Sequence, residues 1–134
     1  MQKRIGLILL FVCIVTIMIA GCTAIPDLTG TWKGTAVGHT KMEGFVEYNV
    51  TQYNITTQIG HAFTGQKVYT RKDGKTYNEN FSGIVTSNND IFMGDHGTGY
   101  IEGVLNGMDS MELYYIDEGS DAKAFFILLN RQRI

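Results

Sequence analysis

Two patterns of hydrophobic and polar residues divide the chain. An uncharged, mostly apolar run extends from Ile5 to Pro26, directly after Lys3 and Arg4. A short basic segment followed by an apolar stretch is typical of a secretory signal peptide. An uncleaved anchor is the alternative, because about 20 apolar residues suffice to span a bilayer. Both interpretations place the rest of the chain outside the cytoplasm, since Lys3 and Arg4 hold the N-terminus inside.

The second pattern, which begins after residue 28, is an alternation of apolar and polar residues with a period of two. This period is typical of half-buried strands, and no window of helix length carries a convincing 3.6-residue period. Asp73-Gly74 and Asn106-Gly107 suit tight hairpin turns with positive φ. We therefore predict eight strands, near Gly30–Gly38, Gly44–Thr57, Phe63–Arg71, Lys75–Thr86, Ile91–Asp95, Thr98–Leu105, Ser110–Ile116 and Ala122–Arg131.

Eight short consecutive strands favour an antiparallel up-and-down barrel, because closure removes the exposed edges of a flat sheet. A β-sandwich is the alternative. The apolar positions of the second strand change phase, which predicts a β-bulge near Thr51-Gln52. The last strand is apolar on both faces from Ala124 to Leu129, so we expect its outer side to be covered.

Residues Ile19-Ala20-Gly21-Cys22 follow the apolar run. They resemble the lipobox of prokaryotic lipoproteins, in which the cysteine receives a diacylglyceryl thioether and becomes the new N-terminus. The resemblance covers the first 22 residues and implies lipidation of Cys22, with two acyl chains that anchor the protein stably to a membrane. Cys13 lies within the apolar run, and no cysteine follows Cys22, so no disulfide is expected.

The predicted organisation is a lipoprotein signal peptide at 1–21, a tether at 22–28 and a single β-barrel domain at 29–134. After removal of Lys3 and Arg4, 9 of the 11 basic residues remain against 13 acidic ones, a net charge of −4. A nucleic-acid-binding protein needs a clustered basic surface, and this chain has none, so we expect no nucleic acid partner. The predicted location is the extracytoplasmic face of a cell membrane.

The first strand opens with Thr29-Gly30-Thr31-Trp32, which resembles the Gly-x-Trp start of the calycin barrels, and of avidins in particular. The segment from Ile55 to Gly65 also resembles the second avidin hairpin. In calycins the tryptophan closes one end of the barrel and a basic residue of the final strand stacks on it. The resemblance implies these structural roles for Trp32 and for Arg131, with Arg133 as the alternative. Avidins enclose biotin with several tryptophans; this chain has one, so biotin binding is not expected.

No catalytic or metal motif stands out. His39, His61 and His96 are isolated beside glycine turns, and no serine lies in a nucleophile-elbow pattern. Asp95 and His96 are neighbours, and side chains of adjacent strand residues point to opposite faces. We therefore expect no metal, no cofactor and no enzymatic activity.

Two classes of function remain open. One is a non-enzymatic interaction, structural or inhibitor-like envelope protein with a filled core and a protein partner. The alternative is a barrel that binds a small apolar ligand at its open end. The acidic residues alternate with apolar ones and are predicted on the outer face, including Glu79. The candidate ligand wall is a set of tyrosines: Tyr48, Tyr53, Tyr69, Tyr77, Tyr100 and Tyr115.

Overall fold

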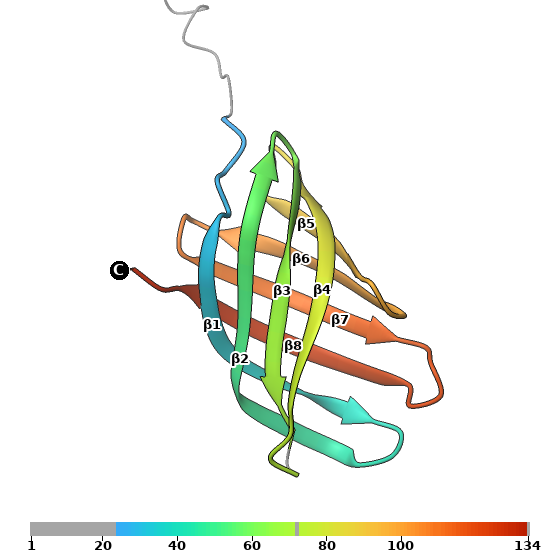
Figure 1. Ribbon diagram of the computed structural model, residues 1–134. Helices are drawn as coiled ribbons and strands as arrows, with labels where there is room; N and C mark the ends of the chain where they lie inside the picture. Colours follow the sequence, from blue (N-terminus) through green and yellow to red (C-terminus); the bar gives the residue numbers. More distant parts are fainter. Residues whose placement is uncertain (1–23, 72, 134) are drawn as a thin grey trace, which may run out of the picture.

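The computed structural model describes residues 24–71 and 73–133, which form a closed antiparallel barrel (Figure 1). Lipidation of Cys22 and the signal or anchor helix concern residues outside this part of the chain. No helix within the described ranges is long and apolar enough to cross a membrane. The strands are β1 (Gly30–Thr40), β2 (Gly44–Ile59), β3 (Ala62–Thr70), β4 (Thr76–Val85), β5 (Asp90–Asp95), β6 (Gly99–Asn106), β7 (Ser110–Asp117) and β8 (Lys123–Arg131).

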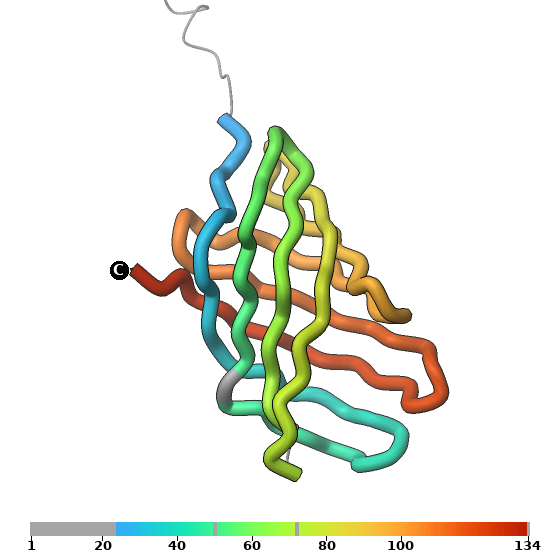
Figure 2. Tube along the Cα trace, in the orientation of Figure 1, coloured from blue at the N-terminus to red at the C-terminus, as the bar shows by residue number. Residues whose placement is uncertain are grey.

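The predicted all-β, eight-stranded up-and-down architecture is confirmed, and the sandwich alternative is wrong. Each strand pairs with its neighbours in sequence, and β1 also pairs with β8, from Trp32 opposite Arg131 to Thr40 opposite Lys123. The trace in Figure 2 shows the first and last strands side by side. Asn106 pairs with Ser110, which leaves a three-residue turn in which Gly107 has a φ of 68°.

The second strand is bent by two irregularities. Opposite β1, the register shifts between Gly34 and Ala36, because β2 carries an extra residue between Tyr48 and Thr51. This is the bulge that the change of apolar phase predicts, displaced by about two residues. It returns Thr51, Tyr53 and Ile55 to the interior. A second shift against β3 lies between Ile55 and Thr57.

One end of the barrel is closed by Trp32, which is 0% exposed. The Arg131 guanidinium carbon lies 4.5 Å from the centre of its ring, and the indole Nε1 donates to the Leu28 carbonyl at 2.8 Å. Arg131 also donates to the carbonyls of Asp27 and Thr29. Trp32 and Arg131, the pair for which the calycin resemblance implies a role in barrel closure, are therefore in contact at the closed end.

The segment before β1 is docked on this closed end. The side chain of Gln58 accepts a hydrogen bond from the Leu28 amide and donates to the Pro26 carbonyl, each at 2.8 Å. Leu28 is fully buried, and Ile25 packs against the core. Figures 1 and 2 show this segment beside the tip of the β2–β3 hairpin. Part of the predicted tether is therefore a structural element of the barrel.

Trp32→Ala is expected to lower the free energy of unfolding by about 3–5 kcal/mol, because it removes a fully buried aromatic ring. Chemical denaturation followed by circular dichroism measures the loss. Phe45→Ala is the control: Phe45 is 85% exposed, and its truncation should change the stability by less than about 0.5 kcal/mol. Similar values for the two variants would contradict the role given to Trp32.

Candidate functional site

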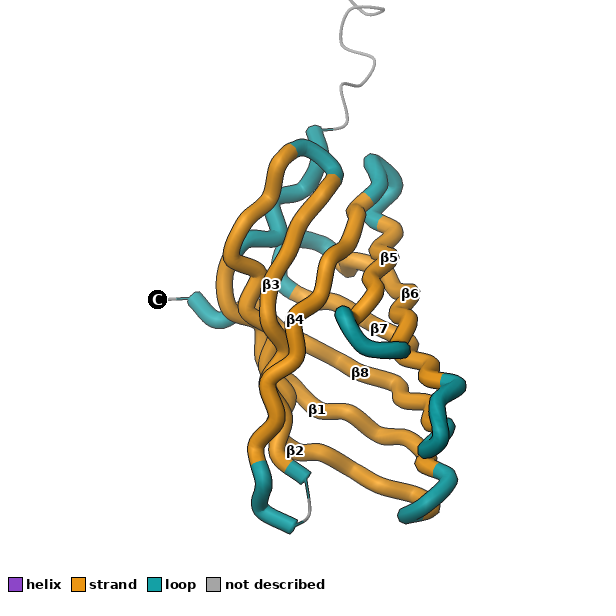
Figure 3. Tube along the Cα trace, turned by 45° about the vertical axis from the view of Figure 1, so that its right-hand side comes forward, coloured by secondary structure: helices purple, strands orange, loops and turns teal. Residues whose placement is uncertain are grey.

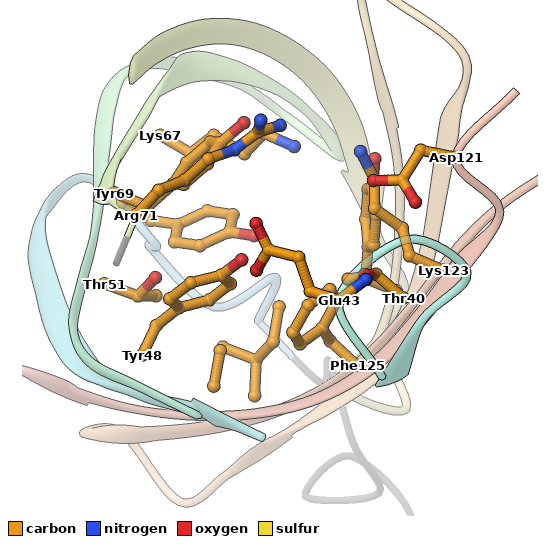
Figure 4. A pocket seen from close by; sticks show the side chains of 14 residues that line it. Thr40, Glu43, Tyr48, Thr51, Lys67, Tyr69, Arg71, Asp121, Lys123 and Phe125 are labelled. Atoms are coloured by element: carbon orange, nitrogen blue, oxygen red, sulfur yellow. The ribbon is translucent and has the colours of Figure 1, made fainter. Parts of the chain in front are cut away.

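The other end of the barrel, away from the docked segment, holds a cavity. In an up-and-down barrel alternate turns share an end, so the β1–β2, β3–β4, β5–β6 and β7–β8 turns surround this opening (Figure 3). The cavity has a volume of about 60 Å³. Side chains from five strands and three turns line it (Figure 4): Ala36, Thr40, Glu43, Tyr48, Thr51, Tyr53, Lys67, Tyr69, Arg71, Tyr115, Asp121, Lys123, Phe125 and Ile127.

Four of the six predicted tyrosines lie in this wall: Tyr48, Tyr53, Tyr69 and Tyr115. Tyr48, Tyr69 and Tyr115 form a connected aromatic surface with Phe125, whereas the Tyr53 ring packs against Phe81. The ring centre of Phe125 lies 5.4 Å from that of Tyr48 in a stacked arrangement and 6.4 Å from that of Tyr115. Burial raises the pKa of Tyr53, Tyr69 and Tyr115 well above the usual value, so these hydroxyls are neutral hydrogen-bonding groups at physiological pH.

The other two tyrosines do not line the cavity. Tyr77 stacks on Tyr69 with ring centres 5.5 Å apart and extends the aromatic surface toward the β3–β4 turn. Tyr100 is 46% exposed on the outer face, and its prediction as a wall residue is wrong. The reason is strand alternation: Gly99 and Ile101 point inward, which turns Tyr100 outward.

A buried lysine is the centre of the polar part of the cavity. Lys67 is 6% exposed, and its Nζ lies 2.9 Å from Asp95 Oδ2 and 2.7 Å from Glu79 Oε2. The same ammonium group lies 4.5 Å from the ring centre of Tyr115, within the range of a cation–π interaction. A buried charge is tolerated only when it is paired and hydrogen-bonded, and both conditions hold here.

Tyr115 connects this lysine cluster to a second carboxylate. Its hydroxyl lies 3.1 Å from Asp95 Oδ2 and 3.3 Å from Asp117 Oδ2. Asp117 also accepts from the Thr98 hydroxyl at 2.7 Å and pairs with Lys123 at 3.2 Å. Gly99 makes room for this contact, since a Cβ there would lie 2.3 Å from Asp95 Oδ2 and 2.4 Å from the Tyr115 hydroxyl.

The two aspartates are held in the charged form. Burial disfavours the carboxylate of Asp95, but hydrogen bonds from Lys67 and the Gly99 amide outweigh it and lower its pKa. The same balance applies to Asp117, where burial is opposed by the Gly119 amide, Thr98 and Lys123, and the pKa falls to about 2. Both aspartates therefore stay ionised at neutral pH.

Charged side chains of opposite sign stand at the rim. In Figure 4, Glu43 extends across the opening between Tyr48 on one side and Lys123 on the other. Arg71 packs over the Tyr77 ring, with its guanidinium carbon 4.5 Å from the ring centre. Among the residues described, no carboxylate lies within salt-bridge distance of Arg71, in contrast to Lys67. An acceptor group that enters the opening would therefore not have to displace a carboxylate from Arg71.

The prediction of an outward Glu79 is wrong, and the charged interior was not foreseen. Glu79 bonds Lys67 and accepts from the Tyr69 hydroxyl at 2.8 Å. The signal was present in the alternation of β3, where Phe63, Lys67 and Tyr69 share the inward phase. The ionic partners of Lys67 come from β4 and β5, and strand pairing alone brings them to it.

The histidines and acids form no metal site: within residues 24–71 and 73–133, no group of three or more His, Cys, Asp or Glu could hold an ion. Asp95 and His96 point apart, because Asp95 faces Lys67 while His96 Nε2 lies 3.0 Å from the exposed Ser82 hydroxyl. His61 Nδ1 lies 2.6 Å from the Val85 carbonyl at the closed end.

No protein-family model matches the chain, and no curated protein matches it either. Solved barrel structures do. EF1p2_mFAP2b, solved bound to DFHBI, is 16% identical over 78% of this chain and 94% of its own, with a TM-score of 0.56. A redesigned β-barrel, b11L5F_LGL, is 12% identical over 79% and 92%, with a TM-score of 0.57. Lobster apocrustacyanin A1, a lipocalin, is 12% identical over 78% of this chain and 60% of its own, with a TM-score of 0.50. The fold is therefore that of a calycin-like β-barrel.

The stability of the barrel is expected to fall as the pH is lowered from about 4 to about 2. Asp117 has a pKa of about 2 in the folded protein against an ordinary 3.8, so its contribution is complete above the ordinary value and is lost as the pH approaches 2. Denaturant midpoints across this range measure the effect. Asp117→Asn should be less stable at neutral pH and should show a shallower acid dependence.

Glu118→Gln is the matched control, because Glu118 is an exposed carboxylate in the adjacent turn. Its acid dependence should follow that of the unmodified protein. An Asp117→Asn variant whose stability falls as steeply with acid as the unmodified protein would contradict the assignment.

Proposed function

We propose that this protein is a non-enzymatic, membrane-anchored binding protein whose barrel takes a small ligand through the opening beside Glu43 and Arg71. The ligand has a mostly apolar body and one hydrogen-bond acceptor or anionic group. The observation that carries the proposal is the convergence of aromatic rings and buried, ordered polar groups at one end of a closed barrel. Such a combination of apolar wall and few placed polar groups is typical of small-molecule sites.

The aromatic and charged parts of the wall have different roles in this proposal. Tyr48, Tyr53 and Phe125 offer ring faces to an apolar body. Arg71 offers a guanidinium to an acceptor. Lys67 is paired with Glu79 and Asp95, so it fixes the positions of these polar groups in the cavity wall. The sequence predicts a tyrosine wall and a small apolar ligand, and the charged rim makes a purely hydrocarbon ligand a poorer fit.

Ligand entry requires the rim to move. The cavity volume of about 60 Å³ is well below the volume of about 300–1,000 Å³ that small-molecule sites enclose. Glu43 is exposed and lies in the β1–β2 turn, so its side chain can turn outward without disturbing the core. Displacement of Glu43 and Arg71 would join the cavity to the space above it.

The proposed membrane anchor gives the opening a direction. Cys22 lies two residues before Ala24, a span of at most about 7 Å. The docked segment from Ile25 to Leu28 lies at the closed end. A lipid on Cys22 would therefore hold the closed end near the bilayer and direct the opening toward the aqueous phase. The ligand would then be drawn from solution rather than from the membrane.

The second candidate is an interaction, structural or inhibitor-like role in the cell envelope. The small volume of the cavity favours it, because the barrel is nearly filled by its own side chains. In this case the functional surface is the outside of the barrel. A protein partner without any small-molecule response would distinguish this candidate from the first.

A small amphipathic ligand is expected to raise the melting temperature of the full-length protein in lipid nanodiscs and to change its tyrosine fluorescence saturably. The measurement is a thermal-shift screen of aromatic and aliphatic carboxylic acids. Arg71→Gln should weaken binding roughly 10- to 100-fold, as expected for loss of one hydrogen bond to a charged group. Trp32 lies outside the cavity lining and reports on the integrity of the fold.

Lys33→Gln is the matched control, because it removes one positive charge from the exposed outer face of β1. Its affinity should equal that of the unmodified protein. Equal weakening by both variants would indicate a general charge effect. The absence of any saturable shift across the screen would favour the second candidate.

Cys22→Ser is expected to release the protein from the membrane or to mislocalise it, because the proposed thioether cannot form. Mass spectrometry of the membrane-bound form should find an acylated N-terminus at Cys22. Cys13→Ser is the control and should remain anchored, since Cys13 lies in the segment that is removed. An intact Met1 terminus or an unmodified Cys22 thiol would contradict the lipoprotein assignment.

A further inference from the structure

The outside of the barrel has an apolar half. Six large hydrophobic side chains on β1, β8, β7 and β6 point outward and are each 39–52% exposed; we call them the apolar wall: Val37, Tyr100, Tyr114, Ile116, Phe126 and Leu128. The register makes them contiguous, since Val37 pairs with Phe126, Phe126 with Tyr114, and Ile116 with Tyr100. Figure 3 shows β1, β8 and β7 side by side across this part of the barrel.

The outer face of β3 and β4, on the opposite side of the barrel, is mostly polar. Its outward positions include Thr64, Gln66, Asn78 and Asn80, and Ile84 near the end of β4 is the exposed large hydrophobic residue among them. Both halves enclose the same apolar core, so the core does not account for the difference. The outward positions of β8 carry Phe126 and Leu128, where the outward positions of β3 and β4 carry mainly amides and hydroxyls. Packing of the core does not explain these two exposed hydrophobic residues, so we look for a contact on the outside of the barrel.

The area of the apolar wall matches one side of a dimer interface. A large hydrophobic side chain presents about 200 Å² in full, so six at these exposures leave roughly 500 Å² uncovered. A homodimer interface of standard size takes about 800 Å² from each partner, of which about 65% is apolar, or roughly 520 Å². We propose that a second copy of this chain covers the wall, in a two-fold symmetric pair.

The charges of the wall agree with this occupant. Its two carboxylates, Glu102 and Glu112, already accept hydrogen bonds from the hydroxyls of Tyr100 and Tyr114. Neither carboxylate therefore depends on a basic partner. The outward positions of β6, β7 and β8 between Tyr100 and Asn130 carry no lysine or arginine, and the outward positions of β1 add a single lysine, Lys33. An anionic bilayer surface is therefore a poor alternative occupant.

The proposed anchor favours the same pairing. With a lipid on Cys22, the closed end faces the bilayer and the apolar wall forms the side of the barrel. Two anchored copies share this orientation, so their walls can meet about a two-fold axis normal to the membrane. Confinement to one surface also raises the effective concentration of each copy for the other. This step rests on the lipoprotein assignment; the wall and its area do not.

The test uses the full-length protein in detergent, with molecular mass measured by analytical ultracentrifugation after subtraction of bound detergent. The unmodified protein should be dimeric, and Phe126→Lys combined with Ile116→Lys should shift it to monomer, with at least a 100-fold weaker association. Thr64→Lys combined with Gln66→Lys on the polar half is the matched control and should remain dimeric. Circular dichroism and Trp32 fluorescence verify that each variant is folded.

A single-thiol experiment gives an independent measurement. No cysteine follows Cys22, so Tyr114→Cys introduces one thiol into the wall and Gln66→Cys introduces one on the opposite half. Oxidation should cross-link the first variant to a dimer and leave the second monomeric. A monomeric unmodified protein, a dimer that survives the wall substitutions, or equal cross-linking at the two positions would overturn the proposal. None of these readouts depends on the ligand, so the result separates this pairing from the proposed binding function.

Discussion

The pairing of β1 with β8 brings the two ends of the domain together and leaves none of the eight strands with a free edge. A domain of this size without a disulfide must obtain its stability from packing, and closure allows one apolar core to be surrounded on all sides. One contact between β1 and β8, that of Arg131 with Trp32, adds most to this pairing. Arg131 stacks on Trp32 and donates to the segment before β1, so strand pairing, core burial and the docking of the N-terminal segment meet in one contact.

The polarity of the barrel interior increases from the closed end toward the opening. Trp32, Leu28 and Leu129 are fully buried near the closure, and the interior there is apolar. Toward the opening the interior becomes aromatic and then ionic, with Lys67 paired to carboxylates from β4 and β5. An ionic pair in such a position contributes little net stability, because desolvation offsets the attraction. What it supplies is a defined arrangement of polar groups beneath the cavity.

Local patterns in the sequence predicted the fold well. Alternation and turn residues located all eight strands, and the phase change of β2 located its bulge, because each signal lies within a few consecutive residues. Non-local contacts were harder to predict. The inward phase of Lys67 could be read from β3, but its partners Glu79 and Asp95 reach it only through strand pairing. The wrong position predicted for Tyr100 has a local cause: residue type alone does not give the inward or outward phase of the strand that carries it.

The two candidate functional surfaces are the cavity opening at the end of the barrel and the apolar wall on its side. The end is polar, concave and bordered by turns, and such regions open at a lower free-energy cost than paired strands. The side is apolar, gently curved and built from paired strands, so it can offer a rigid surface but cannot open. A ligand that displaces Glu43 and Arg71 would alter only turns and rim side chains, and the strands that carry Phe126 and Ile116 would keep their register. Binding at the end and pairing through the side are therefore structurally compatible, and two copies anchored through Cys22, as proposed, would present two openings that face the same way.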